Sequence, residues 1–146
     1  MSKEKKNKAG NIGFLLWQAS NKWQRNMKAA LDSIGLTHVQ YLLLNALAQT
    51  GKTQTQSALA AAAGADVMMT SKVLRTLEKK KFISRKIQAG DSRSMNVQLS
   101  DAGKKILQKA DVLVEKTDED FFSALPSKRS KFVKNLSALL AAGTGK

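Results

Sequence analysis

The spacing of apolar residues predicts a mainly helical chain with long helices at both ends. Between residues 11 and 34, apolar side chains recur every three or four positions, which is typical of an amphipathic helix with one narrow apolar face. A similar spacing follows Ser100, which is placed to cap another long helix, and Pro126 is expected to open the last helix. Both ends of the chain therefore present apolar faces that need a surface to pack against.

A second helix is expected from about His38 to Gln49. Thr37 and Gln40 have the spacing of a capping box in front of an apolar run, and Gly51 marks the end of the helix. The residues just after Gly51 leave room for a short extended link.

Two further helices lie close together in the sequence. The first is short and rich in alanine, begins near Thr55 and ends at Gly64, a residue suited to the left-handed end of a helix. The second spans 66–81 and begins with Asp66, whose carboxylate suits the positive end of a helix. Two helices joined by so short a turn indicate a helix-turn-helix, although an ordinary helical corner would give the same local pattern.

The helix expected at 66–81 has two contrasting faces. With 3.6 residues per turn, the residues that turn toward the core are Thr70, Val73, Leu74 and Leu77. The opposite side, called here the outer stripe, is formed by Met68, Lys72, Arg75 and Lys79. A solvated stripe would normally mix acids with the cations and would have little use for a methionine. The outer stripe is therefore expected to face a binding partner.

After Lys81 the apolar spacing changes to the alternation of β-strands. Segments 82–88 and 94–100 predict two strands, and segment 89–93 between them has the glycine and aspartate of a turn. Arg85 falls on the same face as the apolar residues of the first strand, so the inner face of that strand is imperfect. The pattern predicts a two-stranded wing.

The net charge favours a polyanionic partner. The chain of 146 residues has 25 Lys and Arg against 11 Asp and Glu, a formal charge of +14. Cations that neutralise phosphates release condensed counterions, so nucleic acid is the expected partner, although a merely soluble basic surface would have the same composition. The excess of cations is densest between residues 66 and 93, around the outer stripe.

The composition also excludes several classes of function. There are no cysteines, and a single histidine, His38, rules out a cluster of histidine ligands or a His-based triad within one chain. No metal, cofactor or catalytic group is therefore expected, and the acidic run Asp118–Asp120 is better explained as a solvated helix face. No apolar run has membrane-spanning length and the lysine-rich start is not a signal peptide, so we expect a cytoplasmic protein.

Three segments carry a resemblance to a known family. They are "GLTHVQYLLLNALA", "TQSALAAAAGADVMMTSKVLRTLEKKKFISR" and "GDSRSMNVQLSDAGKKIL", within residues 35–107. With them the chain resembles the MarR (multiple-antibiotic-resistance regulator) family of bacterial transcription factors. The resemblance implies a winged helix-turn-helix in a homodimer that binds a palindromic operator, and in many members a small, often aromatic and acidic effector releases the DNA. Lys81 stands where the family usually has glycine, and Ser92 where it often has a second arginine.

On this basis the whole chain, 1–146, is one mainly α domain with a small β wing. Segment 36–100 is expected to be the DNA-binding lobe, and 11–34 and 101–141 the dimerisation helices. Segment 1–10 is expected to be a basic disordered arm, which would otherwise add non-specific contacts with phosphates.

The residues expected to contact double-stranded DNA come from the helix-turn-helix and the wing. They are Thr55, Gln56, Ser57, Val67, Met68, Met69, Ser71, Lys72, Arg75, Lys79, Arg85, Lys86, Asp91 and Arg93. Lys72 and Arg75 are expected to reach guanine edges or phosphates, and Lys79 phosphates only. At the wing tip, Asp91 and Arg93 are spaced to pair, which would hold the arginine ready for the minor groove.

Dimerisation is expected to bury the apolar faces at both ends of the chain. The residues concerned are Ile12, Leu16, Phe132, Leu136, Leu139 and Leu140. An effector cleft would be lined by Trp17, Trp23, His38 and Tyr41, although packing between helices is the alternative role for all four. The alternative to the whole interpretation is a non-specific architectural DNA- or RNA-binding protein without an effector, which would need exposed aromatic side chains for stacking.

Overall fold

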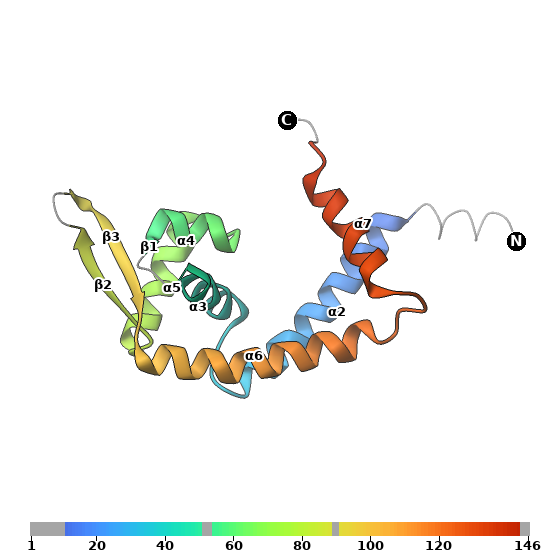
Figure 1. Ribbon diagram of the computed structural model, residues 1–146, viewed down its shortest axis with the longest axis horizontal. Helices are drawn as coiled ribbons and strands as arrows, with labels where there is room; N and C mark the ends of the chain where they lie inside the picture. The colour runs from blue at the N-terminus through green and yellow to red at the C-terminus, as the bar shows by residue number, and fades with distance from the viewer. Residues whose placement is uncertain (1–10, 51–53, 89–90, 144–146) are drawn as a thin grey trace, which may run out of the picture.

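The computed structural model describes residues 11–50, 54–88 and 91–143, so the expected basic arm, 1–10, lies outside the described residues. A lobe of short elements and a pair of helices occupy opposite ends of the structure, and one long helix joins them (Figure 1). The helices of the second part are α2 (Ile12–Asp32) and α7 (Arg129–Ala141), and the joining helix is α6 (Asp101–Phe122). In this described part of the chain, no helix has both the length and the apolar character to cross a membrane.

The lobe contains three helices and a small sheet. The helices are α3 (His38–Thr50), α4 (Gln56–Ala63) and α5 (Val67–Lys79). The strands are β1 (Gln54–Thr55), β2 (Ile83–Gln88) and β3 (Asp91–Leu99), paired antiparallel in the order β1-β3-β2. The prediction of a mainly helical fold with a small β wing is therefore confirmed.

The helix caps expected from the sequence are present. Thr37 and Gln40 form a reciprocal capping box, in which each side-chain oxygen accepts the backbone N–H of the other residue, at 3.0 and 3.1 Å. Thr55, Asp66 and Ser100 each accept a backbone N–H from the first turn of the helix that follows. These local bonds explain why the starts of α4, α5 and α6 could be placed from the sequence.

The wing differs from the prediction in two ways. It has three strands and not two, because β1 pairs with the middle of β3, with Gln54 opposite Val97. Strand β3 also begins at Asp91, which pairs with Gln88 across a register shift, so the expected turn at 89–93 is shorter than predicted. Asp91 and Arg93 thus belong to a strand and not to the turn.

The last helix also begins later than predicted. Pro126 does not open it, since α7 starts at Arg129 after Lys128 as its N-cap residue. The side chain of Arg129 binds back to the end of α6, where it donates to the carbonyl oxygen of Glu119 at 3.1 Å and pairs with the Glu119 carboxylate at 2.8 Å. Pro126 lies in the connection, where its fixed φ suits a bend as well as a helix start.

The hydrophobic core lies inside the lobe and extends to the second half of α2 and the first half of α6. Its fully buried members include Met27 of α2, Leu43 of α3 and Leu74 of α5. Helix α6 reaches this core through Gly103, because a Cβ atom there would collide with the carbonyl oxygen of Phe82. The start of α6 is therefore packed directly on the backbone between α5 and β2.

Candidate nucleic-acid interface

The helix-turn-helix is formed by α4 and α5. Gly64 ends α4 in the left-handed conformation with φ 68°, and only residues 64–66 separate the two helices. Asp66 then starts α5, where its Oδ1 accepts a backbone N–H at 2.9 Å. The two caps fix where α5 begins relative to α4, and so fix which of its side chains face outward.

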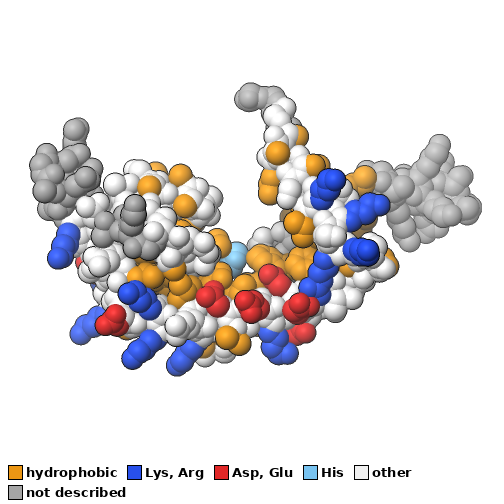
Figure 2. Space-filling model, viewed as in Figure 1, with side chains coloured by type: hydrophobic (Ala, Val, Ile, Leu, Met, Phe, Trp, Pro, Cys, Tyr) orange, Lys and Arg blue, Asp and Glu red, His pale blue; other side chains and the backbone are white. Residues whose placement is uncertain are grey.

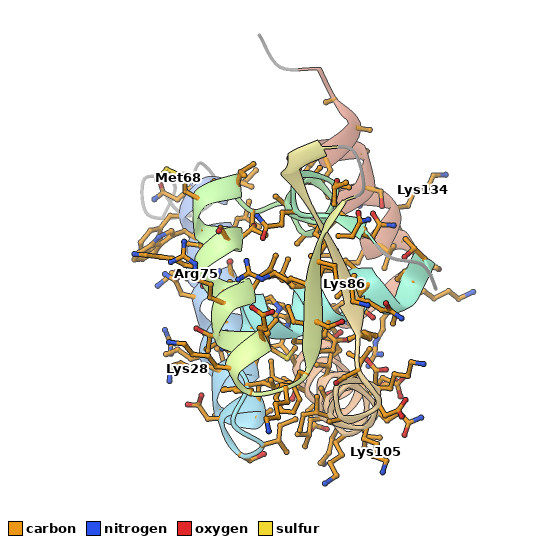
Figure 3. All side chains as sticks on the ribbon, turned by 90° about the vertical axis from the view of Figure 1, so that its left-hand side faces the viewer. Lys28, Met68, Arg75, Lys86, Lys105 and Lys134 are labelled. Atoms are coloured by element: carbon orange, nitrogen blue, oxygen red, sulfur yellow. The ribbon has the colours of Figure 1, made fainter. Side chains whose placement is uncertain are left out.

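One face of α5 attaches it to the lobe. Thr70, Leu74 and Leu77 are fully buried, as the sequence predicts, and Val73, which was expected on the same face, is half-buried. All four residues of the outer stripe are exposed, and Met68 is 83 % exposed. Figure 3 shows Met68 and Arg75 on the same outward side of α5. The outer stripe is thus open to a partner, as expected from its composition.

The outer surface of α5 changes in character along its length. Its first turn exposes the apolar side chains of Val67, Met68 and Met69. Apolar groups at this place suit contact with thymine methyl groups in a major groove, whereas Lys72 and Arg75, one and two turns later, suit the acceptor atoms of guanine. One helix therefore carries both apolar side chains suited to base edges and cations suited to the acceptor atoms of DNA.

The structure gives Arg85 a different role from the one expected. Its side chain is only 13 % exposed, and its guanidinium donates to the Glu78 carboxylate and the Gln56 amide oxygen. These bonds engage the Arg85 guanidinium and the Gln56 amide oxygen within the chain, and the expected contact of these two residues with DNA stays a prediction. No sequence pattern indicated Glu78 as the partner, although the inward position of Arg85 on its strand was a signal for a buried role.

The other expected residues lie around α5. Ser57 near the start of α4 and Lys86 on β2 are exposed, and Ser71 is half-buried. Figure 3 shows Lys86 on β2 of the wing, beside α5. The backbones of Asp91 and Arg93 lie in β3, but their side chains lie outside the described part of the structure.

Charges are unevenly distributed on the face shown in Figure 2. Acidic side chains gather along the middle of α6, and Lys and Arg occupy the outer edge of the lobe and the region of α7. Within α5, Glu78 is the single acid, against Lys72, Arg75 and Lys79. The lobe therefore presents positive potential on the side of the outer stripe.

Comparison with known proteins decides the family. A model described as the MarR family matches residues 36–95. YdcH, an HTH-type transcriptional regulator of Bacillus subtilis, is 42 % identical over 131 residues, which are 88 % of each chain. The chain belongs to the MarR family. Membership makes it a winged helix-turn-helix transcriptional regulator that binds DNA, and not an enzyme.

Solved structures support the MarR fold. BpsR of Bordetella bronchiseptica, whose DNA binding is regulated by 6-hydroxynicotinic acid, superposes with a TM-score of 0.82 at 22 % identity over 90 % of this chain and 94 % of BpsR. MepR of Staphylococcus aureus, solved as a DNA complex, gives 0.77 at 26 % identity over 89 % of this chain and 96 % of MepR.

Three of the four aromatic residues expected in an effector cleft of this MarR protein lie at the junction of α2, α3 and α6. Trp23 Nε1 donates to Asp118 at 2.8 Å, and the Trp23 ring meets the His38 ring edge-on at 5.2 Å. Tyr41 OH donates to Asp111 at 2.9 Å. These hydrogen bonds fit the helix-packing role, and no spacing pattern in the sequence indicated either aspartate as a partner.

Burial changes the proton affinities of two of these groups. Burial lowers the pKa of His38 below its usual value, and the nearby Asp118 carboxylate partly opposes this effect. Burial raises the pKa of Tyr41 strongly, and its hydrogen bond to Asp111 raises it further. Both side chains are therefore neutral at physiological pH, and Tyr41 acts as a hydrogen-bond donor to Asp111.

Trp17 is separate from this group. It is exposed on the first half of α2, and its ring lies on that of Phe14 with 6.0 Å between centroids. A cavity of about 500 Å³ does open beside His38, between α2 and the start of α3, and it is lined in part by Arg25 and Lys28. Asp32 lines the same cavity and pairs with Lys28 at 2.8 Å, so a small anion would meet Arg25 and an aromatic edge there.

The faces expected to form the MarR dimer are open in this single chain. The first half of α2 exposes Ile12 and Leu16, and α7 has no buried residue. Leu139 and Leu140 are exposed, whereas Phe132 and Leu136 are half-buried. In the described residues, no three His, Cys, Asp or Glu side chains are grouped closely enough to hold a metal ion.

Proposed function

We propose that this MarR-family protein is a homodimeric repressor in the cytoplasm that binds a palindromic operator with α5 and the wing. The observation that carries the proposal is the outer stripe, whose four side chains are exposed while Thr70, Leu74 and Leu77 on the opposite face of α5 are buried. A helix held in this way enters a major groove with its first turns on the base edges. An operator that overlaps a promoter would be closed to polymerase when the protein is bound, so repression is the expected result.

Contacts divide along α5 in this proposal. Met68 and its neighbours in the first turn read base edges, with thymine methyl groups as the best match for their apolar surface. Lys72 and Arg75 reach guanine acceptors or phosphates, and Lys79, in the last turn, reaches phosphates only. In the wing, Arg93 enters the minor groove with Asp91 holding it extended, and Lys86 contacts the backbone.

Two exposed helix faces support the dimer. Apolar surface of the kind exposed by α2 and α7 is rarely left in water, and a two-fold dimer that joins these faces would bury it. The same symmetry places two α5 helices about 34–36 Å apart, which is one turn of DNA. Light scattering at micromolar concentration should show a dimer, and a monomer that still binds the operator would contradict this part of the proposal.

An effector completes the proposal. Arg25, Lys28 and His38 line the cavity between α2 and α3, and Trp23 packs on His38. We expect a small aromatic acid to bind in this region, to quench tryptophan fluorescence and to weaken operator binding in the same titration. If a broad panel of aromatic acids changes neither signal, a constitutive repressor is the better description.

The test of DNA recognition is a selection of inverted half-sites from a randomised library, followed by titrations of variants on the selected operator. Lys79→Ala should weaken binding to all sequences about equally and lower the salt slope by about one unit. Lys72→Ala should instead change which bases are preferred, by about 1–3 kcal/mol for each lost discrimination. Lys105→Ala is the matched control, because Lys105 lies on α6 at the far end of the lobe from Met68 (Figure 3).

Two outcomes would contradict the proposal. Equal affinity of the wild-type protein for all sequences would favour an architectural protein. If Lys72→Ala and Lys79→Ala have identical effects across the library, the proposed difference between base contacts and phosphate contacts along α5 is wrong.

A further inference from the structure

Strand β2 carries an arginine that is bonded to two helices at once. Arg85 Nε and Nη2 donate to Glu78 Oε1 of α5, at 3.1 and 3.0 Å. Arg85 Nη1 donates to Gln56 Oε1 at the start of α4, at 2.8 Å. We call these three side chains the Arg85 clamp. The clamp joins the wing to both helices of the helix-turn-helix.

The position of Arg85 makes these bonds necessary. It lies opposite the buried Val97 in the sheet, and its side chain is 13 % exposed. A cation so far from water is stable only when its donors are satisfied and its charge is compensated. The planar guanidinium also fixes the direction of each bond, which a lysine at the same position would not do. Changes in the angle between β2 and α5 would therefore break the clamp.

The partner of Arg85 matters for DNA binding as well. Glu78 is the single acid of α5, and its neighbours Arg75 and Lys79 belong to the outer stripe. An uncompensated carboxylate at this place would repel phosphates. Arg85 neutralises that carboxylate from inside the lobe, so the cations of the outer stripe act on the DNA without an opposing charge.

We propose that Arg85 and Glu78 are positioning residues, which hold the wing at a fixed angle to α5 so that the minor-groove and major-groove contacts are made together. They act through α5 and the wing and do not touch DNA. This inference rests on the proposed operator binding, but it makes separate predictions about residues that the operator does not contact.

The decisive variant is Glu78→Ala, because two explanations predict opposite changes in its affinity for the operator. If only charge mattered, removal of an acid near DNA would strengthen binding. If Glu78 holds the wing, the variant should bind the selected operator about 2- to 30-fold more weakly, the range expected when a residue outside the contact surface modulates it. Glu78→Gln keeps the oxygen that accepts both Arg85 bonds and should recover most of the affinity.

The remaining variants test whether the two residues act as one unit. Arg85→Ala should weaken binding about as much as Glu78→Ala, and the double variant should lose little more than either single one. Arg93→Ala should cost less affinity in the Glu78→Ala background than in the wild type, because the wing is already misplaced. A loss of stability alone would not produce that coupling. All titrations use one operator, one salt concentration and a temperature well below each melting transition.

The outcomes separate the clamp from the proposed function. Tighter operator binding by Glu78→Ala would overturn the clamp. A salt slope that falls by about one unit in Arg85→Ala, but is unchanged in Glu78→Ala, would also overturn it and would make Arg85 a phosphate contact. If Lys72→Ala changes base preference as expected while the clamp variants bind like the wild type, the clamp alone is wrong. If the wild type binds no operator, both proposals fail.

Discussion

Replacement of Lys81 by glycine should stabilise the protein. Lys81 follows the end of α5 with φ 68°, the left-handed conformation, and Phe82 N–H closes the turn on the carbonyl oxygen of Leu77 at 3.0 Å. Gly35 and Gly64 take the same conformation, with φ of 74° and 68°, where two other helices end. A side chain in this conformation costs roughly 1–2 kcal/mol, and the larger entropy loss of glycine on folding offsets roughly 0.5–1 kcal/mol of the gain. We therefore expect Lys81→Gly to add about 0.5–1 kcal/mol.

The matched control is Lys81→Ala, which removes the same charge but keeps a Cβ atom. In thermal unfolding followed by circular dichroism at one protein concentration, Lys81→Gly should melt about 1–4 °C above Lys81→Ala. The comparison cancels any effect of the lost cation, so the difference reports the backbone alone. A Lys81→Gly variant that melts at or below Lys81→Ala would show that the left-handed turn is not strained, and the reasoning would fail.

Three more substitutions test single features of the fold by thermal unfolding. Thr70→Val should raise the free energy of unfolding by about 1 kcal/mol and so raise the melting temperature, because the buried Thr70 hydroxyl finds no hydrogen-bond partner among the described residues. An unchanged or lower melting temperature would contradict this. Gly103→Ala should destabilise by about 1–3 kcal/mol, since its Cβ would press on the Phe82 carbonyl, while the exposed Lys104→Ala next to it should be nearly neutral. His38 has a folded-state pKa below the usual 6.5, so the unfolded chain takes up the proton more readily and stability is lost as the pH falls from 6.5 through the lowered value. His38→Gln should lose less stability than the wild type between about pH 7 and about pH 5, and parallel losses would refute the assignment.

Local chemistry explains why much of the helix-turn-helix could be predicted from the sequence. The start of α5 follows from one carboxylate, Asp66, and its inner and outer faces follow from a period of 3.6 residues. Gly64 marks the end of α4 in the same local way. Each of these signals needs only residues within a turn or two, so the packing of the rest of the chain does not alter it.

Features that depend on distant partners were missed or misplaced. Strand β1 is two residues long and has no apolar period, so only its pairing with β3 defines it. Arg85 carries a charge in a segment rich in cations, and charge alone suggested DNA as its partner. Its actual partners, Gln56 and Glu78, are 29 and 7 residues away in the sequence. A charged residue on the inward face of a strand is the sequence signal for such an internal pair, and it should outweigh net charge in proteins of this kind.

Helix α6 makes the lobe and the proposed dimer layer mechanically dependent on each other. At its start, Ser100 donates its hydroxyl to the carbonyl oxygen of Lys81 at 2.6 Å, so the helix is tied to the turn that ends α5. Near its other end, Asp118 accepts the indole N–H of Trp23 from α2. A continuous helix of 22 residues is stiff over this distance, so a change in how α2 packs on α6 must tilt the start of α6 as well. The start of α6 is bonded to the end of α5. In the proposed dimer, a ligand that bound one packing of α2 and α6 more tightly than another would therefore also select the spacing of the two α5 helices.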